Sequence, residues 1–499
     1  MKRVLVEKNR YFDSVFLMRI SREIEKLADV EQAVVSMATP ANVDLLTQAG
    51  FERKSNVSPQ DLLVAIEASS EATFESAREH LQSLLAGSGE EDHAVTRPGS
   101  LREALGRDPK ANLALISVPG EYAAREARKA LHAGLHVMLF SDNVSVEDEF
   151  ILKREAIDRG LLMMGPDCGT AILSGVPLGF ANACRRGTIG IVGASGTGIQ
   201  EISSLVHQLG GGISQAIGTG GRDLSADVGA AMTRFGIDAL AGDASTDVIV
   251  VVSKTPAPQV AQAVVETLKG SGKPGVVHFV GAGEREADSS VQFAPTLADA
   301  AYIACDRAGV EASLPGKTIE TTESARGRIL GLFCGGTLCQ EAWSIIDQAG
   351  FAVVSNVAGD PEKKVHAETQ VAGHALWDLG DDVFTVGRPH PMIEPSLRDE
   401  RVALAGADSD VGVVLVDCVI GYGAHEDPAR SLGEASRSAV ATAKAAGRKL
   451  FIIASVTGTD LDPQGAPGQR AKLEDAGVMV AGSNAAAVNM AIGLLRGAS

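Results

Sequence analysis

The chain has 499 residues, too many for one compact core, and this length predicts three or four domains. Hydrophobic residues make up 45% of the chain and aromatic residues only 4%, with 55 glycines, which is typical of an α/β protein and excludes a disordered one. The formal net charge of −18, without any run of Lys and Arg, argues against nucleic acid as a partner.

The sequence also bears on the cellular compartment. No segment reaches the roughly 18 apolar residues that a membrane span needs, and the N-terminal stretch lacks the apolar region of a signal peptide. The six cysteines are scattered and form no C-x-x-C spacing, which favours reduced thiols. We therefore expect a cytoplasmic protein that contacts no membrane and holds no structural metal.

Residues 1–90 alternate short apolar runs with amphipathic patterns. Strands are predicted at 3–9, 31–38 and 61–68, and helices at 14–27 and 73–87. This alternation predicts a small α+β domain over 1–90. The polar stretch 87–100, which contains Gly and Pro, is predicted to be a linker.

From residue 101 a regular βα rhythm begins. Buried strands are predicted at 113–119, 136–142 and 161–167, with helices at 120–134 and 146–160 between them. Short apolar strands separated by amphipathic helices indicate parallel pairing. Residues 101–186 are therefore predicted to form about half of a Rossmann-type domain.

A repeat at an offset of 140 residues occupies the rest of the chain. The stretch GTIGIVGASGTGIQE at 187–201 aligns without a gap with GRILGLFCGGTLCQE at 327–341. Each repeat continues with a glycine turn followed by Arg, at 218–225 and 386–391, and then with further apolar strands and helices. We interpret 187–310 and 326–499 as two tandem doubly wound domains.

The duplicated turns each open a helix directly after a strand. Such a turn offers unpaired N–H groups and a positive helix end, which suit phosphate or carboxylate. A single turn of this kind is as often an ordinary strand-to-helix connection that binds no ligand. We predict that the two turns face each other and share one anion. The predicted binding residues are Ala194, Ser195, Gly196, Thr197 and Gly198 in the first turn, Gly335, Gly336 and Thr337 in the second, and Gly220 and Gly221 before Arg222.

Several longer motifs carry a family resemblance. MGPDCGTA, GASGTGIQE, IGTGGRDLS, DLGDDVFTVGRPHPMIEPSLR and VTGTDLDPQ run in the order of the FdrA family of acyl-CoA-synthetase-like proteins, which is similar to the succinyl-CoA synthetases. The resemblance covers most of the chain from about 110 onward. It implies a Rossmann-like CoA-binding-type domain at 101–186, followed by two flavodoxin-like domains at 187–310 and 326–499.

The sequence departs from the synthetase pattern at the sites of phosphate relay. The synthetases carry a phosphohistidine in a G-H-A-G-type loop, whereas the equivalent stretch here has only His278, within a predicted strand. Residues 1–100 lack the glycine loop expected for CoA, and neither an ATP-grasp domain nor a P-loop is found. We therefore expect no cofactor, with CoA as the alternative whose glycine loop is missing.

The resemblance implies a subunit of an oxamate carbamoyltransferase, which interconverts oxalurate plus phosphate with oxamate plus carbamoyl phosphate in allantoin breakdown. The implied partners are phosphate or carbamoyl phosphate, a small carboxylate or amide, other transferase subunits and carbamate kinase, in an oligomer or hetero-complex. Two alternatives stay open. One is an NDP-forming acyl-CoA ligase subunit, and the other is a non-catalytic scaffold.

Four side chains are the candidate catalytic groups, and each has a structural alternative. Arg222 and Arg388 follow equivalent glycine turns and suit a carboxylate or phosphate, unless they form surface ion pairs. Lys254 ends a strand, where open parallel sheets bind ligands, but an exposed loop lysine fits equally. His390, between two prolines, could act as an acid/base group or oxyanion donor, or be structural.

Other polar residues have mainly structural interpretations. Asp167 is more often a turn residue than a catalytic one. We interpret Cys168, Cys334 and Cys339 as small core or turn residues. A ring of aspartates could bind a cation, but a solvated loop is the simpler interpretation of its members, Asp378, Asp381 and Asp382.

Overall fold

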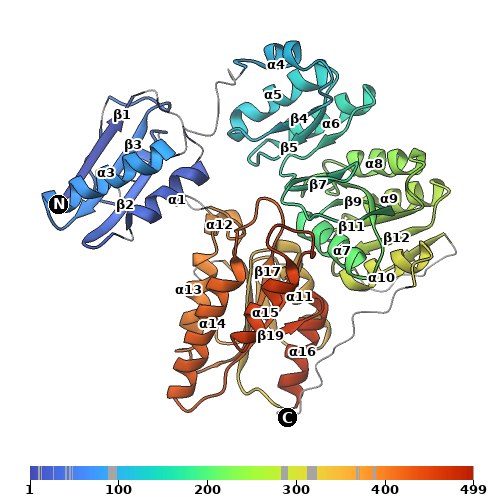
Figure 1. Ribbon diagram of the computed structural model, residues 1–499. Helices are drawn as coiled ribbons and strands as arrows, with labels where there is room; N and C mark the ends of the chain where they lie inside the picture. The colour runs from blue at the N-terminus through green and yellow to red at the C-terminus, as the bar shows by residue number, and fades with distance from the viewer. Residues whose placement is uncertain are drawn as a thin grey trace. The chain divides into compact units, whose positions relative to one another are not determined.

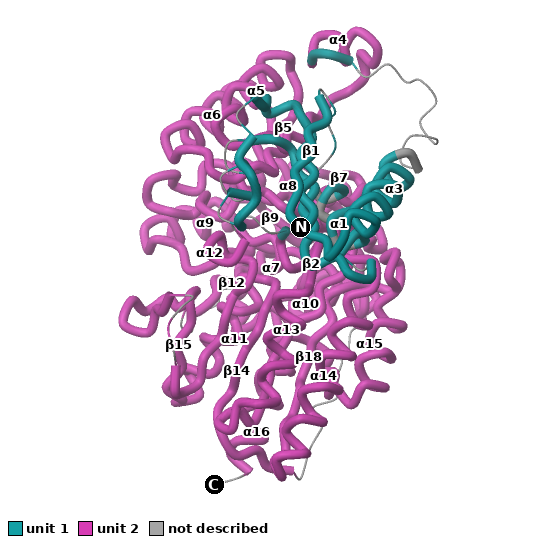
Figure 2. The backbone as a smooth tube through the Cα atoms, turned by 90° about the vertical axis from the view of Figure 1, so that its left-hand side faces the viewer, with its two compact units in different colours: residues 1–100, 386–389 teal, residues 101–385, 390–499 magenta. Residues whose placement is uncertain are grey.

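The computed structural model describes residues 98–282, 290–311, 323–366, 369, 371–385 and 389–497, and residues 1–87 apart from 9, 11, 13, 26, 40, 41, 44, 45, 48 and 55. It divides into two compact units (Figure 2). One comprises residues 1–100 and 386–389, and the other comprises 101–385 and 390–499. No helix in the described part of the chain is long and apolar enough to cross a membrane.

The first unit is the small α+β fold predicted from the sequence. Its sheet has the antiparallel order β1-β3-β2, with β1 at Lys2–Glu7, β2 at Val30–Met37 and β3 at Leu62–Ala68. The central strand β3 is buried at nearly every position, whereas β2 alternates, as a strand with one covered face does. Helices α1 (Ser14–Glu25) and α3 (Glu71–Gly87) contribute to its apolar core.

The second unit begins with the predicted half-Rossmann sheet. Its parallel strands are β4 (Leu113–Ile116), β5 (His136–Leu139) and β6 (Met163–Met164), with helices α4 (Leu101–Arg107), α5 (Gly120–His132) and α6 (Val146–Asp158). The sheet is shorter than the predicted range 101–186. The hairpin of β7 (Thr170–Leu173) and β8 (Val176–Gly179) instead pairs antiparallel with the edge of the next sheet.

That next sheet contains the first repeat, in the order β13-β12-β11-β9-β10-β7-β8. Its parallel strands are β9 (Arg186–Ala194), β10 (Ile213–Gly218), β11 (Val248–Ser253), β12 (Gly275–Phe279) and β13 (Val291–Phe293). The helices between them are α7 (Gly196–Gln208), α8 (Ala231–Gly242) and α9 (Pro258–Gly270), and α10 (Leu297–Arg307) follows β13.

The second repeat forms a six-stranded parallel sheet, in the order β15-β16-β14-β17-β18-β19. Strands β17 and β19 of this sheet are labelled in Figure 1. Its strands are β14 (Arg328–Phe333), β15 (Val353–Ser355), β16 (His374–Asp378), β17 (Val411–Val419), β18 (Phe451–Thr457) and β19 (Met479–Ala481). Its helices are α11 (Gly336–Gln348), the short η1 (Pro361–Lys363), α12 (Asp382–Thr385), α13 (Ser396–Ala405), α14 (Pro428–Ala445), α15 (Ala466–Asp475) and α16 (Asn484–Arg496).

The two repeats share most of their strand order. In both sheets the first strand, β9 or β14, lies beside the first of the last three strands, which follow in chain order to the edge. The first repeat has β10 on the other side of β9, which is the flavodoxin-like doubly wound order. The second repeat differs here, because β16 is inserted between β14 and β15, and the first repeat adds the β7–β8 hairpin beyond β10.

The repeats pack against each other through equivalent helices. In the first repeat α7 packs on α10, in the second α11 packs on α16, and α7 contacts α11. Side chains of both repeats, among them Ile199, Ile202, Leu338 and Ile492, belong to one buried apolar cluster. The duplicated strand–turn–helix units are therefore held face to face by a common core, which positions their turns.

Candidate functional site

The first duplicated turn joins β9 to α7. Ser195 is the N-cap of α7, and its hydroxyl accepts a hydrogen bond from the Gly198 N–H at 3.1 Å. Serine is a preferred N-cap because its oxygen satisfies one of the helix's otherwise unpaired N–H groups. The Gly198 N–H that the sequence analysis offered to an anion is therefore already bound within the turn.

The second turn joins β14 to α11 and meets the first directly. The Ser195 Oγ and Thr337 Oγ1 atoms lie 2.7 Å apart in a buried position. A Cβ atom on Gly335 would lie 2.9 Å from Thr197 Cγ2, so glycine permits this close approach. The prediction that the two turns face each other is confirmed.

The start of α11 is flanked by the protein's own carboxylates, which the sequence analysis did not foresee. Asp417, within β17, accepts the N–H groups of Cys334 and Gly335, both at 2.7 Å. The Gly335 N–H is therefore unavailable to a bound anion. Asp378, at the end of β16, approaches so closely that a Cβ on Gly336 would lie 2.5 Å from its Oδ2. The second turn is not the empty anion cradle that we expected.

Lys254 supplies the positive charge beside these carboxylates. It follows β11 and is half-buried, and its Nζ would lie 3.6 Å from a Cβ on Gly336. It forms no ion pair or hydrogen bond with any described residue. Burial raises the pKa of Asp378 to about 7 and that of Asp167 to about 6, and the charge of Lys254 opposes both shifts. Lys254 thus lies in a buried acidic setting, as a ligand-binding cation would.

The glycine turn before Arg222 packs on the turn GPDCG at residues 165–169. Gly220 has a φ of +87°, and a Cβ there would lie 2.2 Å from the Pro166 carbonyl oxygen, so only glycine fits. A Cβ on Gly221 would lie 3.2 Å from Asp167 Oδ2. These two glycines therefore have a packing reason that needs no bound phosphate.

Arg222 is engaged by another part of the chain. Its Nε donates to Glu149 Oε2 at 3.0 Å, and its Nη2 donates to the Val144 carbonyl oxygen at 2.8 Å. The ion-pair alternative considered for Arg222 therefore describes its contacts. The sequence could not show this, because Glu149 belongs to α6 of the preceding sheet.

The same glutamate also binds a fully buried lysine. Lys153 donates to Glu149 at 2.6 Å, to Asp223 at 2.8 Å and to the Thr219 carbonyl oxygen at 2.9 Å. A buried ammonium needs such a complete set of acceptors to offset its lost hydration. The network fastens α6 to the loop after β10, and nothing in the sequence pattern had singled it out.

His390 is half-buried next to the second turn, while Arg388 lies outside the described residues. Burial lowers the pKa of His390 to about 4, so its imidazole is neutral at pH 7. Its Nδ1 accepts the Met392 N–H at 3.2 Å, which assigns the ring proton to Nε2. Nε2 would lie 2.5 Å from a Cβ on Gly380. Of the predicted roles, hydrogen-bond donor fits this state better than general base.

The cysteines and one aspartate test the remaining interpretations. Cys168, Cys334 and Cys339 are buried, so the prediction of small core or turn residues is confirmed, and burial raises the pKa of each thiol. Asp378 is only 6% exposed, so the solvated-loop interpretation is wrong for this residue. No three His, Cys, Asp or Glu side chains in the described ranges are arranged to hold a metal ion.

A reciprocal pair of glutamates explains the rest of the duplicated motif. Glu201, on α7, accepts the Asn484 N–H at the start of α16 at 3.0 Å. Glu341, on α11, accepts the Leu297 N–H at the start of α10 at 2.7 Å. Each repeat thus caps the last helix of the other. The signal was visible as matching Glu residues 140 positions apart, but their partners were not.

Glu201 and Glu341 are also linked through side chains. Glu201 accepts the Thr457 hydroxyl at 2.5 Å, and Glu341 accepts Asn484 Nδ2 at 2.8 Å. Burial raises the pKa of both carboxyls, to about 7 for Glu341. At the interface between the repeats, each of these two carboxylates therefore accepts two hydrogen bonds.

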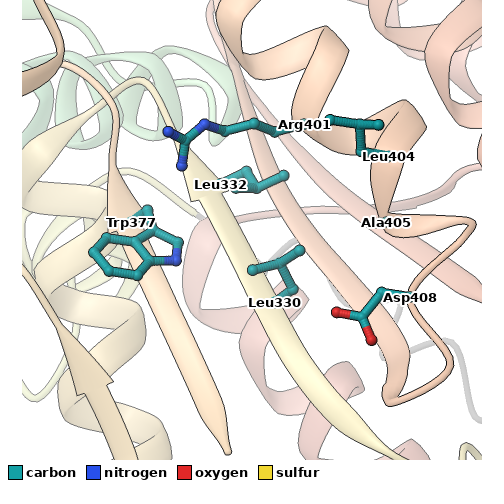
Figure 3. A pocket seen from close by; sticks show the side chains of 7 residues that line it. All are labelled: Leu330, Leu332, Trp377, Arg401, Leu404, Ala405 and Asp408. Carbon is teal, nitrogen blue, oxygen red and sulfur yellow. The ribbon is translucent and has the colours of Figure 1, made fainter. Parts of the chain in front are cut away.

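A cavity of about 180 Å³ lies on the opposite face of the second sheet (Figure 3). It is lined by Leu330 and Leu332 of β14, Trp377 of β16, Arg401, Leu404 and Ala405 of α13, and Asp408. Leu332 and Trp377 belong to the apolar cluster beneath α13 and α14, not to the one shared with α7. The cavity contains none of the predicted site residues.

Comparison with known proteins adds three matching families. The CoA-ligase family matches residues 332–494, the CoA binding domain family matches 185–281, and the family "AllF, heavy metal-associated domain" matches 1–98. The CoA-binding match covers the stretch containing the first turn, not the 101–186 range for which we expected a CoA-binding-type domain. "Uncharacterized protein YahF" of Escherichia coli (strain K12) is 44% identical over 498 residues, 97% of this chain and 96% of its own. The chain belongs to the FdrA family.

The FdrA family lies in the succinyl-CoA synthetase superfamily, and further relatives reflect this. "Succinate--CoA ligase [ADP-forming] subunit alpha 2" of Archaeoglobus fulgidus is 32% identical over 126 residues, 24% of this chain and 44% of its own. The mitochondrial alpha-2 subunit of the same ligase from Trichomonas vaginalis is 30% identical over 214 residues, 40% of this chain and 68% of its own. The FdrA chain is thus acyl-CoA-ligase-like in the part that carries both turns.

The raised pKa of Asp378 gives a testable dependence of stability on pH. Because its folded-state value of about 7 exceeds the ordinary 3.8, its stabilising contribution is complete below pH 3.8 and is lost as the pH rises toward 7. Relative to Asp378→Asn, the wild type should lose on the order of 3–4 kcal/mol between those limits. Free energies of unfolding from urea titrations at pH 4 and pH 7.5 measure this, and parallel pH curves for the two proteins would contradict it.

Proposed function

We propose that this FdrA-family chain is a subunit of a carbamoyltransferase that interconverts oxalurate plus phosphate with oxamate plus carbamoyl phosphate. The observation that carries the proposal is the direct meeting of two helix N-terminal turns, through Ser195 and Thr337, beside the unpaired cation of Lys254. Two positive helix ends and a lysine suit a phosphate and the oxygen that gains charge in acyl transfer. The AllF-type match at 1–98 supports a place in the allantoin pathway.

The chemistry requires little beyond positioning. A phosphate oxygen attacks the ureido carbonyl carbon, the bond from that carbon to the oxamate nitrogen breaks, and the phosphate proton passes to that nitrogen. The start of α7, with Ser195 and Thr197, would hold the phosphate, and Lys254 would offset its charge. Neutral His390 would donate Nε2–H to the carbonyl oxygen as it gains charge. No nucleotide or CoA enters this reaction.

The ligase alternative is favoured by the CoA-ligase and CoA binding domain matches. It needs a histidine that can be phosphorylated. His278 lies within β12, is 1% exposed, and its Nδ1 lies 2.9 Å from the Ala294 carbonyl oxygen. A strand histidine buried in this way cannot receive a phosphoryl group without leaving the sheet. We therefore place the ligase second, and a scaffold without catalysis third.

Lys254→Met tests the proposed role directly. We expect oxamate-dependent phosphate release from carbamoyl phosphate to fall roughly a hundredfold, because a charge that stabilises the transferring group is lost. Lys444→Met, on the exposed surface of α14, is the matched control and should keep its activity. The assay uses the full chain, alone and with the other transferase subunits and carbamate kinase that we propose as its partners.

Two results would contradict this function. One is wild-type protein that neither binds carbamoyl phosphate nor releases phosphate from it with oxamate. The other is radiolabel retained on the chain after incubation with γ-labelled ATP, which would favour the ligase.

A further inference from the structure

We infer that Asp378 recognises the amino group of a carbamoyl ligand, so that the site selects carbamoyl phosphate over acyl phosphates that lack this group. The inference rests on the proposed function and names the specificity-determining residue of the same site. It is carried by one carboxylate oxygen that has no hydrogen-bond partner among the described residues, by the cation beside it and by the helix end between them.

The unpaired oxygen is Asp378 Oδ2. The other carboxylate oxygen, Oδ1, accepts the Gly380 N–H at 2.9 Å, and the backbone of Asp378 is held in both directions by the Asn356 side chain. Oδ2 has no hydrogen-bond partner among the described residues, although the residue is only 6% exposed. A carboxylate oxygen that has no donor of its own, on a residue that is largely buried, is suited to accept a ligand's N–H.

The direction of Oδ2 places it at the start of α11, beside Lys254. A Cβ on Gly336 would lie 2.5 Å from Oδ2 and 3.6 Å from Lys254 Nζ, so both atoms flank the same point. They do not form a direct ion pair with each other, and Lys254 has no other partner in the described part of the chain. The α11 N-cap, Gly335, contributes no side-chain cap. An acceptor oxygen and a cation thus both lie at the start of α11.

A carbamoyl group matches this set. Its carbonyl oxygen accepts, as the helix N–H groups and Lys254 require, and its amino group donates, as Oδ2 requires. An acetyl group has the same shape but replaces the amino group with a methyl group, which would leave the buried carboxylate facing a non-donor. Sites built to hydrogen-bond a group reject analogues that lack it more strongly than apolar pockets reject extra bulk.

Isothermal titration calorimetry on the full chain with three ligands tests the inference. Carbamoyl phosphate carries the amino group, acetyl phosphate replaces it with a methyl group, and inorganic phosphate has no acyl group. We expect the wild type to bind carbamoyl phosphate at least about tenfold more tightly than acetyl phosphate. Asp378→Asn should reduce this ratio to about two, while its affinity for phosphate changes by less than about threefold. Asp238→Asn, an exposed change on α8, should keep the wild-type ratio.

The outcomes separate this inference from the proposed function. A wild type that binds phosphate but does not distinguish the two acyl phosphates overturns the inference, and this comparison needs no variant to fold. A ratio that survives in Asp378→Asn also overturns it and leaves the transferase function standing. Failure of all three probes to bind the wild type overturns both.

Discussion

The rate of oxamate-dependent phosphate release from carbamoyl phosphate is expected to fall about a hundredfold or more in a Gly336→Ala variant that keeps its fold. The new Cβ would come within 2.5 Å of Asp378 Oδ2, so the carboxylate must move away from the start of α11. Lys254 Nζ, 3.6 Å from the same position, would lose its place as well. Loss of one preorganised polar contact at a reacting centre commonly costs about 3 kcal/mol in activation free energy.

Gly196→Ala is the matched change in the first turn and should be milder. The nearest atom to its Cβ would be Thr170 Oγ1 at 3.2 Å, and a small shift of that side chain would relieve the contact. Gly493→Ala, with nothing within 4 Å, controls for the substitution itself. Steady-state rates of the three variants test this order of effects, and thermal unfolding of each variant shows whether its fold is retained. Equal losses at Gly336 and Gly196 would show that Asp378 is not the group displaced.

The largest loss of stability is expected when the reciprocal glutamates are removed. Glu341→Ala leaves two buried donors, the Leu297 N–H and Asn484 Nδ2, without their acceptor, and Glu201→Ala does the same to the Asn484 N–H and the Thr457 hydroxyl. Each unsatisfied buried group costs about 1–3 kcal/mol, so each variant, which leaves two such groups, should lose roughly 2–6 kcal/mol. The loss arises at the interface between the repeats, where α7 contacts α11.

A double-mutant cycle shows whether the two caps act as one interface. Glu201 and Glu341 share Asn484 as a partner, so the loss in the double variant should not equal the sum of the single losses. Ser195 and Thr337 meet at the N-terminal ends of α7 and α11, the helices that carry Glu201 and Glu341. The affinity of these variants for phosphate should therefore fall together with their free energy of unfolding. Glu266→Ala, exposed on α9, serves as control. Additive losses with unchanged phosphate binding would contradict the coupling.

The sequence by itself determined the repeat and the position of its turns. The alignment of 187–201 with 327–341 predicts two strand–turn–helix units, because apolar runs broken by small residues define both the buried strand and the start of the helix. It also placed Ser195, Thr337 and Lys254 at strand ends, where doubly wound sheets bind ligands. These are local properties, set by backbone preferences and by the period of burial, so neighbouring residues suffice to predict them.

Only the tertiary structure decided which polar groups meet. Ser195 and Thr337 are 142 residues apart, and Glu201 lies 283 residues from the Asn484 N–H that it accepts. Asp417 had one visible signal, a carboxylate within the apolar run VGVVLVDCV, but its partners at the start of α11 did not follow from that run. Arg222 was a candidate catalytic group, with an ion pair as its alternative, and it is bound to Glu149. Such pairings depend on how the sheets and helices pack, because a side chain's partner is set by the surface brought against it and not by its neighbours in the chain.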